Sequence, residues 1–151
     1  ERSFQLLSQV MAYTQFAKLL SSRTIVQTFD PTNNAVVAAV KADYHMFFRK
    51  EIDYRALSSN PPFTRIIRIM FSHRDYETCH LKIQKMAKYL DDYIKETNIQ
   101  DVYVVAPSRG YPFRLRNKYR YQIFVKGSNP QRVIHHVHFS TGWLIDVDPI
   151  E

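Results

Sequence analysis

The sequence predicts an α+β fold: a four-stranded antiparallel sheet with two helices on one face, preceded by a mostly helical N-terminal extension. Three observations support this prediction. The composition is globular, with 45% hydrophobic residues and only three glycines in 151 residues. The clearest break, Ser-Ser-Asn-Pro-Pro at 58–62, divides the chain into two parts. After this break, strand and helix patterns follow the order βαββαβ, which is the ferredoxin-like split arrangement.

Before the break, the sequence predicts helices and one short strand. A first helix is expected through residue 20, from residues at three- and four-residue steps: Phe4, Leu7, Val10, Tyr13 or Thr14, and Ala17. A strand at 25–29 is closed by the Asp-Pro turn at 30–31. Asn33 and Asn34 offer N-caps for a helix through residue 41, and another helix is expected at 43–57.

After the break, each expected element has its own apolar pattern. A strand at 64–72 places Ile67, Ile69 and Phe71 on one face. A long helix at 75–96 follows, with a core stripe of Cys79, Ile83, Met86, Leu90 and Ile94. The remaining expected elements are strands at 102–105 and 119–126, a short helix at 130–137 and a last strand at 143–147.

The charge is unevenly distributed along the chain. The net charge is +7, and the stretch from Val102 to Ile145 contains no Asp or Glu. A field of one sign attracts polyanions such as nucleic acids, although the same charges also serve as a solubilising surface. Most acids lie between Asp43 and Asp101, and this asymmetry favours a basic face directed at a partner.

The strand at 119–126 indicates where that face lies. Its alternate residues Tyr119, Tyr121, Ile123 and Val125 are expected in the core. The other face of this strand and the loop at 107–117 then supply candidate DNA-binding residues, whose cations would contact phosphates and whose Phe124 would stack on a base. They are Arg109, Arg114, Arg116, Lys118, Arg120, Phe124 and Lys126. Alternatively, these side chains are merely solvated.

The sequence contains no catalytic signature, phosphate-binding loop or HExxH motif. Asp146 and Asp148 are expected to pair with arginines, and His135, His136 and His138 to form a basic helix face, rather than to bind metal. We therefore predict no catalytic residue, metal ligand or cofactor in this chain. The lone Cys79 favours a reducing, cytoplasmic setting, and no apolar run reaches the ~18–20 residues that span a bilayer.

Several short segments share one order along nearly the whole chain. They are residues 1–10, Gln-Thr-Phe-Asp-Pro at 27–31, Asp43-Tyr44 with Phe47-Phe48, Glu51 and Arg55, Pro-Pro-Phe at 61–63, Tyr-Arg-Tyr-Gln at 119–122 and Asp-Val-Asp-Pro at 146–149. Together they resemble the C-terminal region of PriA-type primosomal helicases, a family that restarts stalled replication forks. The resemblance implies a fragment with a helicase-lobe remnant at 1–29, a helical linker at 30–62 and a DNA-binding and docking domain at 63–151.

The chain departs from this family at its last helicase motif. Tyr13 and Phe16 stand where the family has arginines that reach the ATP phosphates, and a ring cannot neutralise developing phosphate charge. The resemblance implies either a parent that has lost ATP-driven unwinding or a divergent branch that binds and recruits. Sites for ATP, Mg²⁺ and zinc would lie upstream of this chain.

The resemblance also implies partners. These are forked or single-stranded DNA, other primosome proteins, and the acidic, phenylalanine-ended tail of single-stranded-DNA-binding protein. Arg132 and His136 occupy the family's positions for docking that tail, where His136 replaces the usual Gln. Two alternatives stay open: an RNA-recognition-like module, and a ferredoxin-like enzyme regulated by a small molecule.

Overall fold

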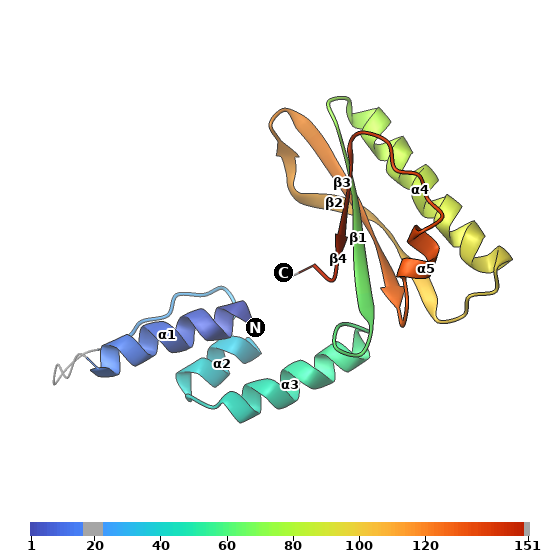
Figure 1. Ribbon diagram of the computed structural model, residues 1–151. Helices are drawn as coiled ribbons and strands as arrows, with labels where there is room; N and C mark the ends of the chain where they lie inside the picture. The colour runs from blue at the N-terminus through green and yellow to red at the C-terminus, as the bar shows by residue number, and fades with distance from the viewer. Residues whose placement is uncertain (17–22, 150–151) are drawn as a thin grey trace. The chain divides into compact units, whose positions relative to one another are not determined.

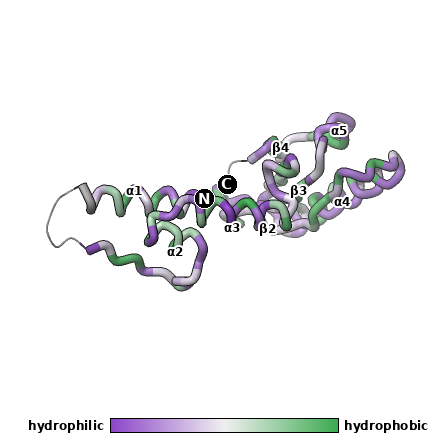
Figure 2. The backbone as a smooth tube through the Cα atoms, turned by 90° about the horizontal axis from the view of Figure 1, so that it is seen from below, coloured by the Kyte–Doolittle hydropathy of each residue, from purple (hydrophilic) through white to green (hydrophobic). Residues whose placement is uncertain are grey.

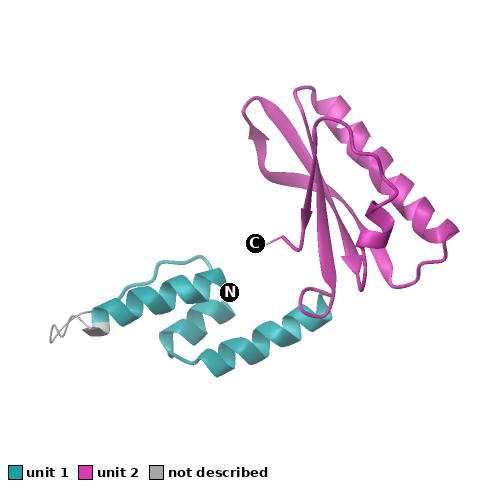
Figure 3. Cartoon of the chain, viewed as in Figure 1, with its two compact units in different colours: residues 1–58 teal, residues 59–151 magenta. Residues whose placement is uncertain are grey.

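The computed structural model describes residues 1–16 and 23–149 of the chain. It contains two compact units, residues 1–58 and residues 59–151, which Figure 3 colours separately. The predicted continuation of the first helix to residue 20, including Ala17, lies outside the described residues. Each unit has its own hydrophobic core.

Unit 1 is helical, as expected for the N-terminal extension. Its helices are α1 (Arg2–Phe16), α2 (Asn34–Val40) and α3 (Tyr44–Leu57). The side chain of Asn33 caps α2 by accepting from the Ala35 amide at 3.0 Å, and Asp43 caps α3. Both caps satisfy an amide that has no partner within its helix. The helices predicted at 34–41 and 43–57 are therefore confirmed.

Small residues and one ring pair form the core of unit 1. Phe4 stacks on Phe47 with ring centroids 4.3 Å apart, and Ala35, Ala38 and Ala39 are buried beside them. Alanines allow helix backbones to approach closely while losing little side-chain entropy.

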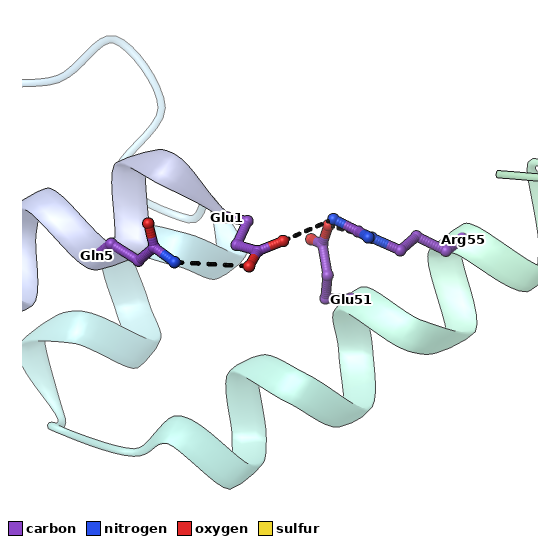
Figure 4. Close-up of polar contacts among 4 residues, drawn as sticks. All are labelled: Glu1, Gln5, Glu51 and Arg55. Carbon is purple, nitrogen blue, oxygen red and sulfur yellow. Dashed lines mark hydrogen bonds and ion pairs between the residues drawn. The ribbon is translucent and has the colours of Figure 1, made fainter. Parts of the chain in front are cut away.

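An ion-pair network joins α3 to Glu1, the residue that precedes α1. Arg55 on α3 binds both Glu51 and Glu1 at 2.9 Å, and Gln5 donates to Glu1 (Figure 4). The contact with Glu51 is the main cause that raises the pKa of Arg55.

The strand predicted at 25–29 is wrong. These residues have no regular secondary structure, and Ile25 and Phe29 are fully or almost fully exposed. A β-branched and aromatic segment forms a strand only where a neighbouring strand pairs with its backbone. The described residues of unit 1 form helices and loops, so that neighbour is lacking.

Unit 2 confirms the predicted ferredoxin-like fold. Its sheet has the order β2–β3–β1–β4, and all neighbouring strands are antiparallel. Helices lie on one face of the sheet, as Figure 1 shows. The elements in chain order are β1 (Arg65–His73), α4 (Tyr76–Glu96), β2 (Val102–Leu115), β3 (Lys118–Gly127), α5 (Gln131–Ile134) and β4 (Trp143–Val147).

The core lies between the sheet and α4. Hydrophilic and hydrophobic residues alternate along α4 (Figure 2), and its apolar side meets the central strands. Three predicted groups are confirmed here, although Met86 and Tyr119 are only partly buried: Ile67, Ile69 and Phe71 on β1; Cys79, Ile83, Met86, Leu90 and Ile94 on α4; and Tyr119, Tyr121, Ile123 and Val125 on β3. We call this side of the sheet the helix face and the other side the open face.

Two elements differ from their predicted lengths. The stretch 107–117, predicted as a loop, is mostly strand, because β2 continues to Leu115 through two irregularities in its register. Prolines at 107 and 112 are tolerated because β2 is an edge strand. The helix predicted at 130–137 stops at Ile134, in a stretch of Val, Ile and His residues with modest helix propensity. His135 and His138 therefore do not share a helix face.

Candidate nucleic-acid interface

The hairpin formed by β2 and β3 carries most of the predicted basic residues. Its two-residue loop, Arg116-Asn117, has positive φ at both positions, 49° and 62°. Such a type I′ turn matches the right-handed twist of paired strands. The Arg114 guanidinium donates to the side-chain oxygen of Asn117 and so braces the turn.

The structure distributes the predicted set over both faces of the hairpin. Arg109 pairs with Tyr121 and Arg114 with Tyr119, so both arginines lie on the helix face. Lys118, Arg120, Phe124 and Lys126 alternate with these tyrosines along β3 and lie on the open face. The predicted basic strand face is present, but the arginines of β2 do not belong to it.

On the helix face, two arginines cover a cluster of rings. Arg109 lies over Phe113 at 4.8 Å, and Arg114 lies over Tyr119 at 5.2 Å from the ring centroid. Both arginines are exposed. A guanidinium stacked on a ring keeps its edge N–H groups available for phosphate oxygens.

Beneath these arginines, the hydroxyl groups of Tyr121 and Tyr76 share a hydrogen bond of 3.2 Å. This hydrogen bond is the main cause that raises the pKa of Tyr76. The two rings are also packed edge to face, with centroids 6.1 Å apart. The base of the hairpin is thereby joined to the first turns of α4.

On the open face, the predicted residues are less accessible. Arg120 is half-buried, with its Nε 3.1 Å from the Met70 sulfur and its Nη1 3.3 Å from the Tyr111 carbonyl oxygen. Phe124 is half-buried, and Lys126 donates to the side chain of Asn60 at 2.8 Å. These residues have structural contacts in addition to any role in binding.

The most accessible positive charge lies near the turn. Arg116 and Lys118 are exposed, like Arg109 and Arg114. None of these four side chains forms an ion pair within residues 1–16 and 23–149, and Arg120 forms none there either. The reason is the absence of acids in this part of the sequence. Five cations thus stand on one hairpin with no counter-charge from the part of the chain that the structure describes.

The aspartates near the end of β4 bind arginines, as predicted. Arg68 binds Asp146 at 2.6 Å, and Arg65 binds Asp148 at 2.6 Å. The hydrogen bond from Arg65 is the main cause that lowers the pKa of Asp148. No group of three or more potential metal ligands occurs among the residues that the structure describes.

The two predicted docking residues lie at α5. Arg132 is exposed on the helix, and His136 follows its C-terminus with its ring 5.4 Å from that of Tyr93. A pocket of about 420 Å³ also borders α5. Neither Arg132 nor His136 lines it; its lining is mostly apolar and comprises Ile67, Gln131, Ile134, His135, Val137, Phe139, Ile145 and Val147.

Sequence reasoning missed this pocket and one ring. The pocket exists where α5 stops early and leaves the sheet near β4 partly uncovered, which periodicity did not reveal. The ring is Tyr111, whose side chain is 93% exposed in the middle of the basic hairpin. Its signal in the sequence is an aromatic residue between Gly110 and Pro112 in an acid-free stretch.

Comparison with known proteins identifies relatives of the chain. No family model matches it. It is 27% identical to the replication restart protein PriA of Chlamydia pneumoniae, over 99% of this chain and 21% of the relative. The corresponding protein of Borreliella burgdorferi is 30% identical over 82% of this chain and 18% of the relative. That of Bacillus subtilis is 27% identical over 83% of this chain and 15% of the relative.

The chain thus spans about a fifth of the length of the curated relatives it matches. None of the helices among the described residues is long and apolar enough to cross a membrane. The similarity extends over both units, from the helical extension to the sheet. The chain belongs to the PriA family of replication restart proteins and corresponds to the C-terminal region of that family.

Proposed function

We propose that this chain is the DNA-binding and protein-docking region of a primosomal replication-restart protein. The proposal rests on one observation: five cations of the β2–β3 hairpin have no acidic partner among the described residues. They are Arg109, Arg114, Arg116, Lys118 and Arg120. Phosphate contacts supply most of the affinity in sequence-independent DNA binding. We infer forked or single-stranded DNA as the ligand, since the relatives are replication restart proteins.

Salt dependence of binding tests this role. The variant Arg114→Ala/Arg116→Ala/Lys118→Ala removes three exposed cations near the turn. Each lost phosphate contact flattens the plot of log Kd against log salt by ~0.9 on duplex DNA and ~0.7 on single strands. We therefore expect weaker binding and a slope reduced by about two to three units on duplex DNA.

The chain offers a matched control. Lys82, Lys85 and Lys88 are exposed on α4, and their replacement by Ala changes the net charge by the same amount. The control variant should retain the slope of the wild type. The hairpin would have no role in DNA binding if its variant kept the slope of the wild type. The same conclusion would follow if the hairpin variant and the α4 variant lost equal amounts of affinity and slope.

Docking of an acidic, phenylalanine-ended tail, such as that of single-stranded-DNA-binding protein, is the second part of the proposal. Arg132 supplies a guanidinium for the terminal carboxylate, and the basic surface attracts the acidic residues. His136 lies four residues further along the chain, just beyond the end of α5, and supplies a second polar contact. The pocket beside α5 is an apolar slot on the same element.

A peptide titration tests the docking. Arg132→Ala should cost roughly 1.5–3 kcal/mol, the range for hydrogen bonds to charged groups. Amidation of the terminal carboxylate of the peptide should weaken binding similarly, and the two changes should not add. Ile134→Glu, which places a charge in the pocket, separates the slot from the carboxylate clamp. Equal affinity in all cases would exclude docking at α5.

ATP and zinc chemistry form the last part of the proposal. Tyr13, at a position where the resemblance expects an arginine, has a side chain that is 76% exposed and cannot act as a cation. We place nucleotide hydrolysis and zinc binding, where the longer protein has them, outside these 151 residues. The RNA-binding alternative is decided by the Kd values for single-stranded RNA and forked DNA at two salt concentrations.

A further inference from the structure

Tyr111 lies in the most irregular segment of the sheet. Arg109 pairs with Tyr121 and Arg114 with Tyr119, so residues 110–113 of β2 stand opposite Arg120 alone. The surplus backbone has to bulge away from β3. Tyr111 lies within this bulge, and its side chain is 93% exposed.

The bulge is held in place by its neighbours on β3. Gly110 is buried, and a Cβ atom built on it would lie 3.2 Å from the Cβ of Arg120, so the backbone of β2 runs close to that side chain. The Arg120 guanidinium donates to the carbonyl oxygen of Tyr111 at 3.3 Å. The exposed ring is thus carried on a fixed backbone next to a cation.

An exposed ring among cations that have no acidic partner within the described residues has a specific use in nucleic-acid binding. Cations hold the phosphates and bring the strand to the surface, while the face of a ring stacks on a base that has no base-pairing partner. A base inside a duplex presents its faces to neighbouring bases and is not available for such stacking.

We propose that Tyr111 stacks on an unpaired base and makes the hairpin selective for single-stranded DNA or the single-stranded part of a fork. This inference rests on the proposed DNA-binding function and specifies its ligand. It also moves the stacking role from Phe124, which is half-buried on the open face, to a ring that a base can reach.

The test measures binding of the 151-residue chain to a short single strand that carries a fluorescent adenine analogue, to the same strand with abasic sites, and to a duplex of equal length. The variants are Tyr111→Ala and Tyr111→Phe. The control is Tyr89→Ala, which removes another exposed tyrosine, 49% accessible and carried by α4 instead of by the hairpin. Emission of Trp143 verifies that each variant is folded.

Tyr111→Ala should weaken binding to the single strand about 5- to 150-fold, which corresponds to the ~1–3 kcal/mol measured for stacking of one base. It should also abolish quenching of the adenine analogue. Tyr111→Phe keeps the ring and should change the Kd less than about twofold. On the abasic strand and on the duplex, Tyr111→Ala should have little effect.

Other outcomes overturn the proposal. If the Tyr111→Ala variant binds the single strand with the same Kd as the Tyr89→Ala variant, the ring of Tyr111 makes no contact with the DNA. An equal loss on single strand, abasic strand and duplex shows a contact that does not involve bases. If the Tyr111→Phe variant binds the single strand as weakly as the Tyr111→Ala variant, the contribution to binding comes from the hydroxyl group and not from stacking of the ring. If the wild type binds none of these DNAs, the DNA-binding function itself fails, which is a different result from a defect confined to Tyr111.

Discussion

Gly127 closes β3 at a point where a side chain has no room. A Cβ atom at this position would lie 2.2 Å from the carbonyl oxygen of Asp101 and 2.8 Å from the Cα of Val102, and both atoms belong to the backbone. The φ of Gly127 is +155°, a conformation that L residues rarely adopt. Gly127→Ala is therefore expected to separate the start of β2 from the end of β3.

The magnitude follows from what the separation disrupts. A strained backbone conformation costs about 1–3 kcal/mol. Moving β2 exposes Val102, which is 3% accessible, and full burial of such a side chain contributes about 1.5–3 kcal/mol. Together they give a loss of about 2.5–6 kcal/mol, a large part of the ~5–15 kcal/mol of a typical domain.

Urea denaturation followed by fluorescence measures this loss. Trp143 is the single tryptophan of the chain and packs on Phe71 at 4.7 Å, so its emission reports the unfolding of unit 2. The control is Gly110→Ala, where φ is ordinary and the nearest atom is the Arg120 Cβ at 3.2 Å. It should cost about 1 kcal/mol or less. A Gly127→Ala protein as stable as the Gly110→Ala protein would refute the steric argument.

Three further predictions concern the caps, the charges and the core. Asp43→Ala removes the acceptor for the Met46 amide and should lower the stability of unit 1 by about 1 kcal/mol, measured by circular dichroism with Trp143 emission unchanged. The pKa of Asp148 is held below its ordinary value of 3.8, so its ionised form stabilises the fold above that pH. Asp148→Asn should thus be less stable than wild type at neutral pH, with the difference closing as the pH falls below 3.8; a constant difference would contradict this. Ile69→Ala on the central strand should cost about 2–5 kcal/mol in urea, and a loss below 1 kcal/mol would contradict its place in the core.

The regular elements of unit 2 could be predicted because their burial follows one period. On β1 and β3 every second residue faces α4, and on α4 the buried residues recur at three- and four-residue steps. Periodicity failed where pairing decides the structure. Residues 25–29 have strand composition without a paired neighbour, and β2 is a strand despite two prolines because β3 pairs with it.

The candidate interface was predictable in sign but not in arrangement. The absence of acids between Val102 and Ile145 is visible in the sequence and fits the lack of an acidic partner for the hairpin cations among the described residues. Which face each arginine takes depends on the register shifts after Val105 and Arg109, which no local pattern encodes. The exposure of Tyr111 has the same origin, because it follows from the bulge.

The strand order has a consequence for how unit 2 reaches its native state. β1 is one of the two inner strands, yet both of its partners come later in the chain, and the contact of Ile66 with Asp148 joins residues 82 positions apart. Such distant pairings slow folding, because a long loop must close before they form. The β2–β3 hairpin, in contrast, closes through a two-residue turn. The segment proposed to bind DNA is therefore the most local part of the sheet, and pulsed hydrogen exchange should find its amides protected before those that pair β1 with β4.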